Sequence, residues 1–441
     1  MIEKYLVKKI TEPVDWKVTV PGSKSMTNRA LLMAVLSAGT VRVEGVLFSD
    51  DSRHFLACLV ALGFTVEIEE EKKCVTVTGC GGRIPRGEAV IDVGSAGTAA
   101  RFLAAMLGFS DGCYEIRCSA QMKRRPMAEL FDLLSGVGAK ITFLEEEGHL
   151  PVRITGCRYA RADKTAGETP RELSLDITKS TQFLSALLLI APMVPEGMKI
   201  HITSEKTDGS YIRITRKMMQ EFGVSVAFDG RDYEVPCRSS YRKETYMVEP
   251  DMSAACYFYA AAAVTGGRAL VRHVHMDNTQ GDLRFLEVLE HMGCTADDTP
   301  EGVLVTGPAD GALRGITVNM NDFSDQALTL AAIAPFADAP VRIEGIGHIR
   351  GQECDRIHAI QTNLTALGIR CEEEETAATI YPGSPHGGSV ETYDDHRVAM
   401  AFSLVGLRTD GIVIENPACC RKTFENYFIL LSELTGKKTE A

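Results

Sequence analysis

Runs of apolar and small residues recur along the chain at nearly constant spacing. Six such runs occur, at residues 25–39, 97–109, 180–192, 252–264, 324–336 and 394–406. Their marker residues Ser25, Gly97, Thr181, Ser253, Asp325 and His396 are separated by 72, 84, 72, 72 and 71 residues. Because a helix that is apolar on all sides is normally buried, the pattern predicts six buried helices in six repeats.

Two further elements follow each apolar run. A short alternating strand comes first, for example TVRVEG at 40–45 or PVRIEG at 340–345. A helix with one apolar face comes next and stops at a glycine, as is common just past a helix C-terminus. These glycines are Gly63, Gly138, Gly223, Gly293, Gly368 and Gly436. The polar segment 159–170 explains the one long interval and predicts a loop.

The repeats predict an α/β fold with two similar domains and with the helices inside the sheets. The sixth repeat ends at its second helix, whereas residues 1–20 contain strand-like segments that precede the first repeat. The simplest closure gives residues 1–20 to the C-terminal repeats. We therefore predict an N-terminal domain at 21–248 with repeats one to three. Residues 1–20 plus 249–441 form the predicted C-terminal domain with repeats four to six. A chain of 441 residues is also too long for one ordinary core.

Polar and basic side chains gather where the buried helices begin. The residues are Lys24, Ser25, Arg29, Ser95, Gly97, Thr98, Ser180, Thr181, Gln182, Asp325, Asp395, His396 and Arg397. Helix N-termini offer free N–H groups and the positive end of the dipole, so they bind anions. Lysine and arginine oppose that dipole and need another reason to be there. The set predicts a site for a multiply anionic ligand, although ordinary capping explains any single helix start equally well.

Further charged residues lie outside these helices. Arg125 precedes a helix in KRRPM, and Lys422 precedes another in CCRKTF. The stretch GQECDR at 351–356 adds Glu353 and Arg356. A site rich in cations favours phosphates or carboxylates as ligands, with Glu353 and Asp325 as candidates for proton transfer. Taken alone, ECD is as typical of a negatively charged first helical turn.

Composition excludes several other classes. The net charge of −12 argues against a nucleic-acid partner. The longest apolar run, ALLLIAPMV, is far shorter than the ~20 residues of a membrane helix, and the N-terminus does not resemble a signal peptide. The sequence contains no nucleotide-binding loop and no paired metal-ligand spacing, so we expect no metal. Thirteen cysteines without a C-x-x-C pair are typical of reduced thiols, which predicts a cytoplasmic protein.

Nine motifs together resemble the 5-enolpyruvylshikimate-3-phosphate synthase family of enolpyruvyl transferases, over nearly the whole chain. They are PGSKSMTNRA, GSAGTAARFLAA, KRRPM, KSTQFLSALLL, VEPDMSAACYF, SDQALT, ECDR, TYDDHRVAM and RKTFENYF. The resemblance implies two domains of three βαβαββ units each, an inside-out α/β barrel, with helix N-termini facing a common cleft. We also expect the two chain crossings to act as hinges, so that the cleft closes on the acceptor. It implies transfer of the carboxyvinyl group of phosphoenolpyruvate to the 5-hydroxyl of shikimate 3-phosphate in chorismate and aromatic amino acid biosynthesis. Phosphate leaves through a tetrahedral intermediate, without a metal or organic cofactor.

The resemblance also assigns residues. It implies that shikimate 3-phosphate is bound by Lys24, Ser25, Arg29, Ser180, Thr181, Gln182, Asp325, His348 and Gln352. It implies that phosphoenolpyruvate is bound by Lys24, Gly97, Arg125, Gln182, Arg356, Arg397 and Lys422. The implied catalytic residues are Asp325 at the 5-hydroxyl, Glu353 as acid and base at the transferred group, and Lys24. We expect a monomer with small-molecule substrates and no nucleic-acid or membrane partner.

Three positions depart from the family pattern. Thr181 stands where a serine is usual, His348 where asparagine is common, and Gln352 where a lysine is usual. The last change removes one charge-assisted hydrogen bond to the phosphorylated acceptor, about 1.5–3 kcal/mol. A related transferase with another acceptor, such as a UDP-sugar or a secondary metabolite, is therefore the alternative. A non-enzymatic repeat protein that binds nucleic acid is a third hypothesis, opposed by the acidic net charge.

Overall fold

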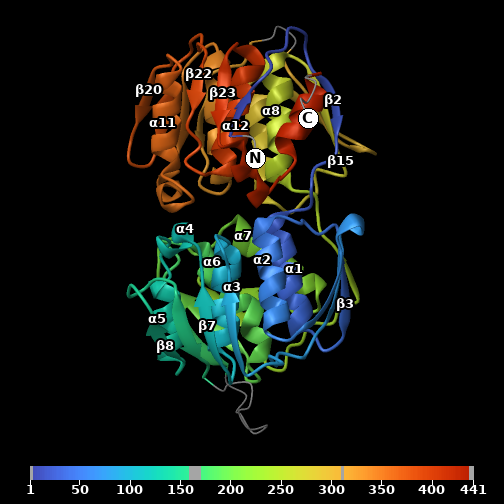
Figure 1. The fold of residues 1–441 in the computed structure, drawn as a ribbon, viewed down its shortest axis with the longest axis vertical. Coiled ribbons are helices and arrows are strands. Elements are labelled where there is room, and N and C mark those ends of the chain that lie inside the picture. The colour runs from blue at the N-terminus through green and yellow to red at the C-terminus, as the bar shows by residue number, and fades with distance from the viewer. Residues whose placement is uncertain (1–2, 158–169, 309–311, 437–441) are drawn as a thin grey trace. The chain divides into compact units, whose positions relative to one another are not determined.

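The computed structural model describes residues 3–157, 170–308 and 312–436 and divides the chain into two compact units (Figure 1). The central unit is Gly22–Glu249, and the terminal unit is Met1–Pro21 with Pro250–Ala441. Each boundary lies one residue from the corresponding boundary expected from the repeats. The predicted loop at 159–170 falls almost wholly outside the described residues.

Six helices of the described chain are buried along almost their whole length, which confirms that part of the predicted fold. They are α1 (Lys24–Leu36), α3 (Gly97–Gly108), α6 (Thr181–Ile190), α8 (Met252–Thr265), α10 (Ala327–Ile333) and α12 (His396–Arg408). α10 is shorter than predicted, because 3-10 turns flank it at η5 (Ser324–Gln326) and η6 (Ala334–Phe336). Pro335 lacks the N–H that a longer α-helix needs.

The second helix of each repeat has one buried face. These helices are α2 (Asp50–Ala61), α5 (Ala128–Gly136), α7 (Ser210–Glu221), α9 (Phe285–His291), α11 (Arg356–Ala366) and α13 (Tyr427–Leu434), with the short α4 (Ala120–Lys123) before α5. The six predicted stop glycines all follow these helices with positive φ, from 64° at Gly436 to 106° at Gly293. Other residues are strained in this region, so glycine ends each helix without cost.

Each repeat contributes one small sheet. The central unit contains the sheets β14-β3-β5-β4, β6-β7-β9-β8 and β10-β11-β13-β12. Their strands are β3 (Thr40–Glu44), β4 (Thr65–Glu69), β5 (Cys74–Thr78), β6 (Glu88–Asp92), β7 (Cys113–Arg117), β8 (Lys140–Phe143), β9 (Val152–Thr155), β10 (Arg171–Leu175), β11 (Met198–Ile202), β12 (Ala227–Phe228), β13 (Asp232–Val235) and β14 (Thr245–Met247).

The terminal unit repeats this plan in the sheets β16-β17-β15-β2, β18-β19-β21-β20 and β1-β23-β22. Their strands are β1 (Lys4–Leu6), β2 (Asp15–Val18), β15 (Arg268–Arg272), β16 (Thr295–Thr299), β17 (Gly302–Thr306), β18 (Thr317–Asn319), β19 (Val341–Glu344), β20 (Cys371–Glu373), β21 (Ala378–Ile380), β22 (Gly388–Val390) and β23 (Ile412–Glu415). The strands that the structure describes form separate sheets rather than a closed barrel.

Two strands belong to the unit that the chain is about to leave. β2 leads into α1 of the central unit, yet it pairs in parallel with β15 of the terminal unit, with Trp16 opposite Ala269 (Figure 1). β14 leads into α8 of the terminal unit, yet it pairs in parallel with β3, with Tyr246 opposite Val43. These two exchanges complete one sheet in each unit, so both crossings of the chain are fixed by strand pairing.

The buried side chains form two separate hydrophobic clusters, one in each unit. The buried helices supply much of both clusters, and the sheets cover them with alternating residues such as Val41 and Val43 of β3. Within the described residues, no helix combines the length and the apolar character needed to span a membrane.

Candidate active site

α1 of the central unit begins with a cation. The Nζ atom of Lys24 lies 3.5 Å from Oδ2 of Asp51, in the first turn of α2, and 18% of the Lys24 side chain is exposed. The Ser25 hydroxyl lies 3.3 Å from that of Ser23. Asp51 is almost completely buried, so it fixes the lysine from inside the unit and leaves its ammonium group near the surface.

Arg29 lies one turn further along α1 and is buried. Its Nε donates to Oγ1 of Thr215 (2.8 Å), and Nη1 donates to the carbonyl oxygen of Ser25 (2.9 Å). The guanidinium also packs against the rings of Phe102 and Tyr211. Burial lowers the pKa of Arg29 to about 10. The residue therefore joins buried helices inside the unit, and its contact with a substrate stays a prediction.

The start of α3 brings two arginines together around a glycine. A Cβ atom on Gly97 would lie 2.8 Å from Cζ of Arg125 and 2.9 Å from Nη1 of Arg101, so a side chain there would force both guanidinium groups to shift. Nη1 of Arg101 also donates to Oε1 of Gln182 (2.8 Å) and thereby orients that amide. Gly97, Arg125 and Gln182, three predicted phosphoenolpyruvate ligands, are thus close neighbours.

The start of α6 lies beside a loop that contains a lysine. The Ser180 hydroxyl caps α6 by accepting from the Gln182 N–H (3.2 Å). A Cβ on Gly209 would lie 3.6 Å from both Cγ2 of Thr181 and Cε of Lys206. The side chains of Thr181 and Lys206 therefore both approach Gly209. Lys206 was not predicted as a site residue, since no helix start contains it.

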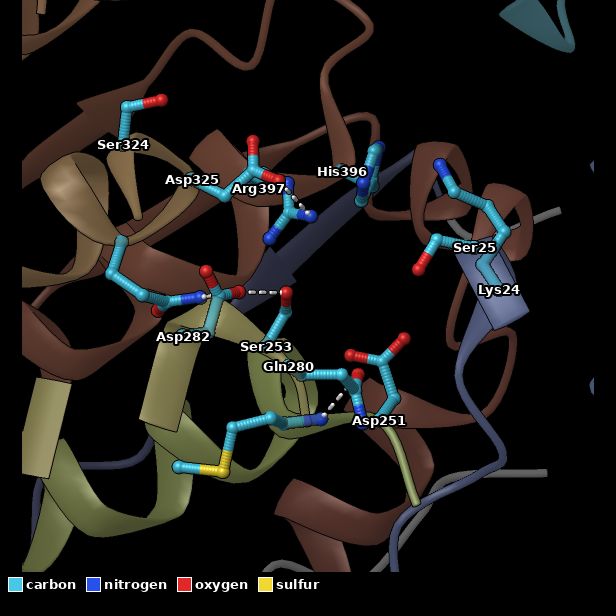
Figure 2. A network of polar contacts seen from close by, with 12 residues as sticks. Lys24, Ser25, Asp251, Ser253, Gln280, Asp282, Ser324, Asp325, His396 and Arg397 are labelled. Carbon is cyan, nitrogen blue, oxygen red and sulfur yellow. Dashed lines mark hydrogen bonds and ion pairs between the residues drawn. The ribbon is translucent and has the colours of Figure 1, made fainter. Parts of the chain in front are cut away.

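Asp325 of the terminal unit lies on the 3-10 turn η5 and binds two arginines. Its Oδ1 accepts from Nη1 of Arg356 at 3.0 Å. Its Oδ2 accepts from Nη2 of Arg397, also at 3.0 Å (Figure 2). Only 15% of the Asp325 side chain is exposed. Both carboxylate oxygens therefore point at cations rather than at solvent.

Arg356 is the centre of this cluster. Its Nε lies 2.8 Å from Oδ2 of Asp395, the cap of α12, and its Nη2 lies 2.9 Å from Oε2 of Glu353. The other Glu353 oxygen, Oε1, lies 3.2 Å from Nζ of Lys422. Burial alone lowers the pKa of Arg356, but Asp395, Glu353 and Asp325 raise it more, so it stays above its usual value. Three carboxylates and three cations are therefore interlocked.

The two acids of GQECDR have different surroundings. Asp355 caps α11 by accepting from the His358 N–H (3.1 Å), and it also pairs with Arg350 (2.8 Å). Glu353 instead faces the cluster around Arg356. The stretch is thus a charged helix start at Asp355 and part of the cluster at Glu353.

Two of the three departures from the family pattern, His348 and Gln352, lie close together in this region. Nε2 of His348, on the turn η7 (Gly347–Gly351), lies 2.8 Å from the Ser324 hydroxyl, next to Asp325. Gln352 follows that turn, and its side chain is half-buried. His348 therefore reaches the Asp325 turn directly, whereas among the described residues the contact of Gln352 is that of its backbone N–H with the Ile349 carbonyl (3.4 Å).

Four residues that contact the predicted site residues were assigned no ligand and no catalytic role from the sequence. They are Asp51, Arg101, Asp282 and Asp395. Arg101 and Asp395 lie at the starts of buried helices, so the pattern of charged residues at helix starts could have indicated them. Asp51 and Asp282 lie outside those starts and gave none. Among the described residues, no group of three or more His, Cys, Asp or Glu side chains is arranged to hold a metal ion.

Solved structures of the same fold define the class. The chain aligns with the enolpyruvyl transferase NikO from Streptomyces tendae with a TM-score of 0.73, over 98% of this chain and 97% of the other. The 16% identity there shows the fold alone. An EPSP synthase from Acinetobacter baumannii aligns with a TM-score of 0.79 and 25% identity, over 98% and 97% of the two chains.

Sequence comparisons then give the family. Residues 8–431 match the family model of EPSP synthase (3-phosphoshikimate 1-carboxyvinyltransferase). The 3-phosphoshikimate 1-carboxyvinyltransferase of Trichormus variabilis is 41% identical over 429 residues, which cover 97% of this chain and 98% of that protein. The enzyme of that name from Nostoc punctiforme is 41% identical over 420 residues, 95% and 96% of the two chains. The chain belongs to the EPSP synthase family and is a transferase, which confirms the resemblance seen in the sequence.

Proposed function

We propose that this enzyme transfers the enolpyruvyl group of phosphoenolpyruvate to the 5-hydroxyl of shikimate 3-phosphate. The observation that carries this proposal is the cluster in which Arg356 bridges the carboxylates of Asp325 and Glu353. The reaction needs one group that takes the hydroxyl proton and another that protonates the methylene carbon. Asp325 and Glu353, which both pair with the buried Arg356, can supply these two groups.

The proposed reaction has an addition and an elimination. Asp325 takes the proton of the 5-hydroxyl of shikimate 3-phosphate. The hydroxyl oxygen at the same time attacks C2 of phosphoenolpyruvate. Glu353 gives a proton to C3, so the double bond becomes a methyl group and a tetrahedral intermediate forms. Glu353 then takes a proton back from that methyl group. The C2–O bond to phosphate breaks and the double bond returns. Inorganic phosphate leaves with the proton that Asp325 took, which restores Asp325 as a base.

Substrate charge couples binding to chemistry in this proposal. Arg397 holds Asp325 and Lys422 holds Glu353, at 3.0 and 3.2 Å respectively. If the phosphate and carboxylate of phosphoenolpyruvate draw these two cations away, both carboxylates lose positive charge nearby. Since a nearby cation lowers proton affinity, its withdrawal makes each carboxylate a better base when the substrate is present.

The central unit supplies the remaining anion ligands in this proposal. Lys24 reaches both substrates, and Gly97, Arg125 and Gln182 bind phosphoenolpyruvate. The 3-phosphate of the acceptor is bound by Ser180 and Thr181, and Ser25 and Arg29 complete the acceptor site. The close packing of Gly97, Arg101 and Arg125 supports the anion site, because two guanidinium groups beside a helix N-terminus concentrate positive charge.

Phosphate release from phosphoenolpyruvate tests the function directly. We expect turnover with shikimate 3-phosphate and a much lower kcat/KM with shikimate, which lacks the phosphate. Stoichiometric formation of the enolpyruvyl ether should accompany phosphate. Absence of turnover with shikimate 3-phosphate, under conditions where a relative is active, would refute the proposal.

We also propose that the enzyme is a cytoplasmic monomer. All thirteen cysteines are free thiols, which suits a reducing compartment. Light scattering after gel filtration should give a mass near 48.0 kDa. A mass of twice that value would refute the monomer.

A further inference from the structure

A buried carboxylate, Asp282, lies outside the set of residues discussed so far for catalysis. It belongs to the turn η4 (Gly281–Arg284) and is 7% exposed. Its Oδ2 accepts from the Ser253 hydroxyl of α8 and from Nε2 of Gln326 (2.8 Å), the residue after Asp325 (Figure 2). Asp282 therefore ties the start of α8 to the turn that presents the candidate base.

The neighbouring residues strengthen this connection. Nε2 of Gln280 donates to the Pro250 carbonyl oxygen (2.7 Å), and Oε1 of Gln280 accepts from the Met252 N–H (3.2 Å). Oε1 of Gln326 accepts from the Thr329 hydroxyl (3.0 Å) in α10. The segment from Gln280 to Asp282 thus fastens the beginnings of two buried helices.

The charged and titratable groups that face Asp282 come from three elements. Asp325 lies on η5, Arg397 on α12 and Cys256 on α8. Burial, and then the negative charge of Asp325, raise the pKa of Asp282 to about 6, while Arg397 opposes this shift. In contrast to Asp325, which has two arginines on its oxygens, Asp282 has neutral hydrogen-bond donors on Oδ2.

We propose that Asp282 is a positioning residue for the transfer reaction: its carboxyl group holds the Gln326 amide, and its charge controls the basicity of Asp325. The inference rests on the proposed role of Asp325 as the base. When Asp282 carries a proton, Asp325 has one negative neighbour fewer and is a weaker base. When Asp282 ionises, the second negative charge makes Asp325 take the hydroxyl proton more readily.

The dependence of kcat on pH tests the proposal. The wild-type kcat should rise between pH 5 and 7 with an inflection near 6. Asp282→Asn keeps the size of the side chain and an acceptor for Gln326, so it should lower kcat at pH 8 by roughly 3- to 10-fold and remove the inflection. The exposed Asp277→Asn, in the same segment, is the matched control and should leave the profile unchanged. A wild-type profile without this inflection, or an inflection that persists in Asp282→Asn, would overturn the proposal.

Ser253→Ala provides a second variant. The Ser253 hydroxyl stabilises the ionised form of Asp282 and lowers its pKa. Without that hydrogen bond the inflection should move to higher pH, by about one unit. A merely structural role of Asp282 predicts a uniform loss of rate without this movement, and that result would also overturn the proposal.

Thermal unfolding gives a readout that needs no turnover. The pKa of Asp282 is raised to about 6 in the folded protein, above the ~3.9 of an unfolded chain. Its contribution to stability is thus present below about pH 4 and is lost as the pH rises to 6. The Tm of Asp282→Asn relative to wild type should therefore increase from pH 4 to 6 and then level off. A constant difference would overturn the proposal, whereas a failed phosphate-release assay alone would refute only the proposed function.

Discussion

Two arginines, one in each unit, are equally buried but have opposite surroundings. Arg29 of the central unit and Arg356 of the terminal unit are each 1% exposed. Arg29 donates to hydroxyl and carbonyl oxygens, for example those of Thr215 and Ser25. Arg356 instead contacts the carboxylates of Asp325, Glu353 and Asp395. The pKa of Arg29 is lowered to about 10 by burial, whereas that of Arg356 is raised by its carboxylates.

The contrast separates two tasks. Neutral oxygens around Arg29 do not cancel its charge, so the central unit keeps a positive interior beneath the helix starts that we assign to anion binding. The charge of Arg356 is balanced by carboxylates, and two of these, Asp325 and Glu353, are the acids that we propose for proton transfer. Helices of the same repeat thus surround a buried arginine with neutral oxygens in one unit and with carboxylates in the other, which suits the two tasks that we propose, anion binding and proton transfer.

Replacing each of the two arginines should show the contrast between their surroundings most clearly. Arg356→Met leaves three buried carboxylates without their common cation, and we expect a loss of about 3–5 kcal/mol in the free energy of unfolding. Arg29→Met leaves only neutral oxygens without donors and should cost about 1–3 kcal/mol. Chemical denaturation of the two variants at pH 7 measures the difference.

The pH dependence of these two variants supplies the control. Carboxylates that lose their cation have raised pKa values in the folded state, so their stabilising contribution is present at low pH and lost as the pH rises. The Tm deficit of Arg356→Met should therefore shrink from pH 7 to pH 4, while that of Arg29→Met stays constant. Equal and pH-independent deficits would contradict the contrast between the units.

The second largest effect is expected for catalysis at Glu353. Glu353→Gln keeps the shape of the side chain but cannot exchange a proton, so kcat for phosphate release should fall by ~100-fold or more. Asp355→Asn, two residues further, is the matched control. Asparagine caps a helix about as well as aspartate, so kcat should change little. If both variants kept full turnover, Glu353 would be only part of a charged helix start.

Gly97 tests the anion site of the central unit. The Cβ of Gly97→Ala would lie 2.8 Å from Cζ of Arg125 and 2.9 Å from Nη1 of Arg101, so both guanidinium groups must shift. We expect the KM for phosphoenolpyruvate to rise by about 10-fold, with a smaller change in kcat. Gly136→Ala, where nothing lies within 4 Å of the new Cβ, should leave both constants unchanged. An unaltered KM in Gly97→Ala would remove Arg125 from the proposed site.

Much of the fold could be predicted from the sequence because it depends on local and periodic signals. The buried helices follow from runs without a polar face, and the helix ends follow from glycines such as Gly63 and Gly293, which have φ of 90° and 106°. The pairing of β14 with β3 was not predicted, since the two strands lie about 200 residues apart and no local signal connects them. The shortening of α10 was missed although Pro335 is a local signal, because the repeat pattern suggested a helix as long as the other buried ones.

The site was predicted less completely, because its partners are distant in sequence. Charged helix starts showed which residue types gather, but not which cation binds which acid. Arg356 and Asp395 are 39 residues apart, and their ion pair follows only from the fold. Burial of Arg29 is a similar case, since Thr215 lies 186 residues away. Asp282 gave no signal at all, because a single aspartate in a turn has no periodicity.

The smallest expected effect concerns Gln352, where the family usually has lysine. Gln352→Lys adds a cation to the half-buried position after η7, on the same unit as the Asp325 turn. If this position faces the acceptor phosphate, the KM for shikimate 3-phosphate should fall by about 3- to 10-fold while kcat changes less than twofold. The gain should weaken at high salt, since a partly exposed charge is screened.

Two comparisons decide whether the gain comes from the phosphate. Gln361→Lys on α11 makes the same change in net charge at another site and should leave the KM unchanged. With shikimate as the acceptor, Gln352→Lys should give no gain, because the group that the lysine would meet is missing. A gain with both acceptors would instead indicate general electrostatic attraction. An increased KM for shikimate 3-phosphate would mean that Gln352 itself contacts the acceptor. The two units would then also differ in how they bind the acceptor, the central unit through cations and the terminal unit through a neutral amide.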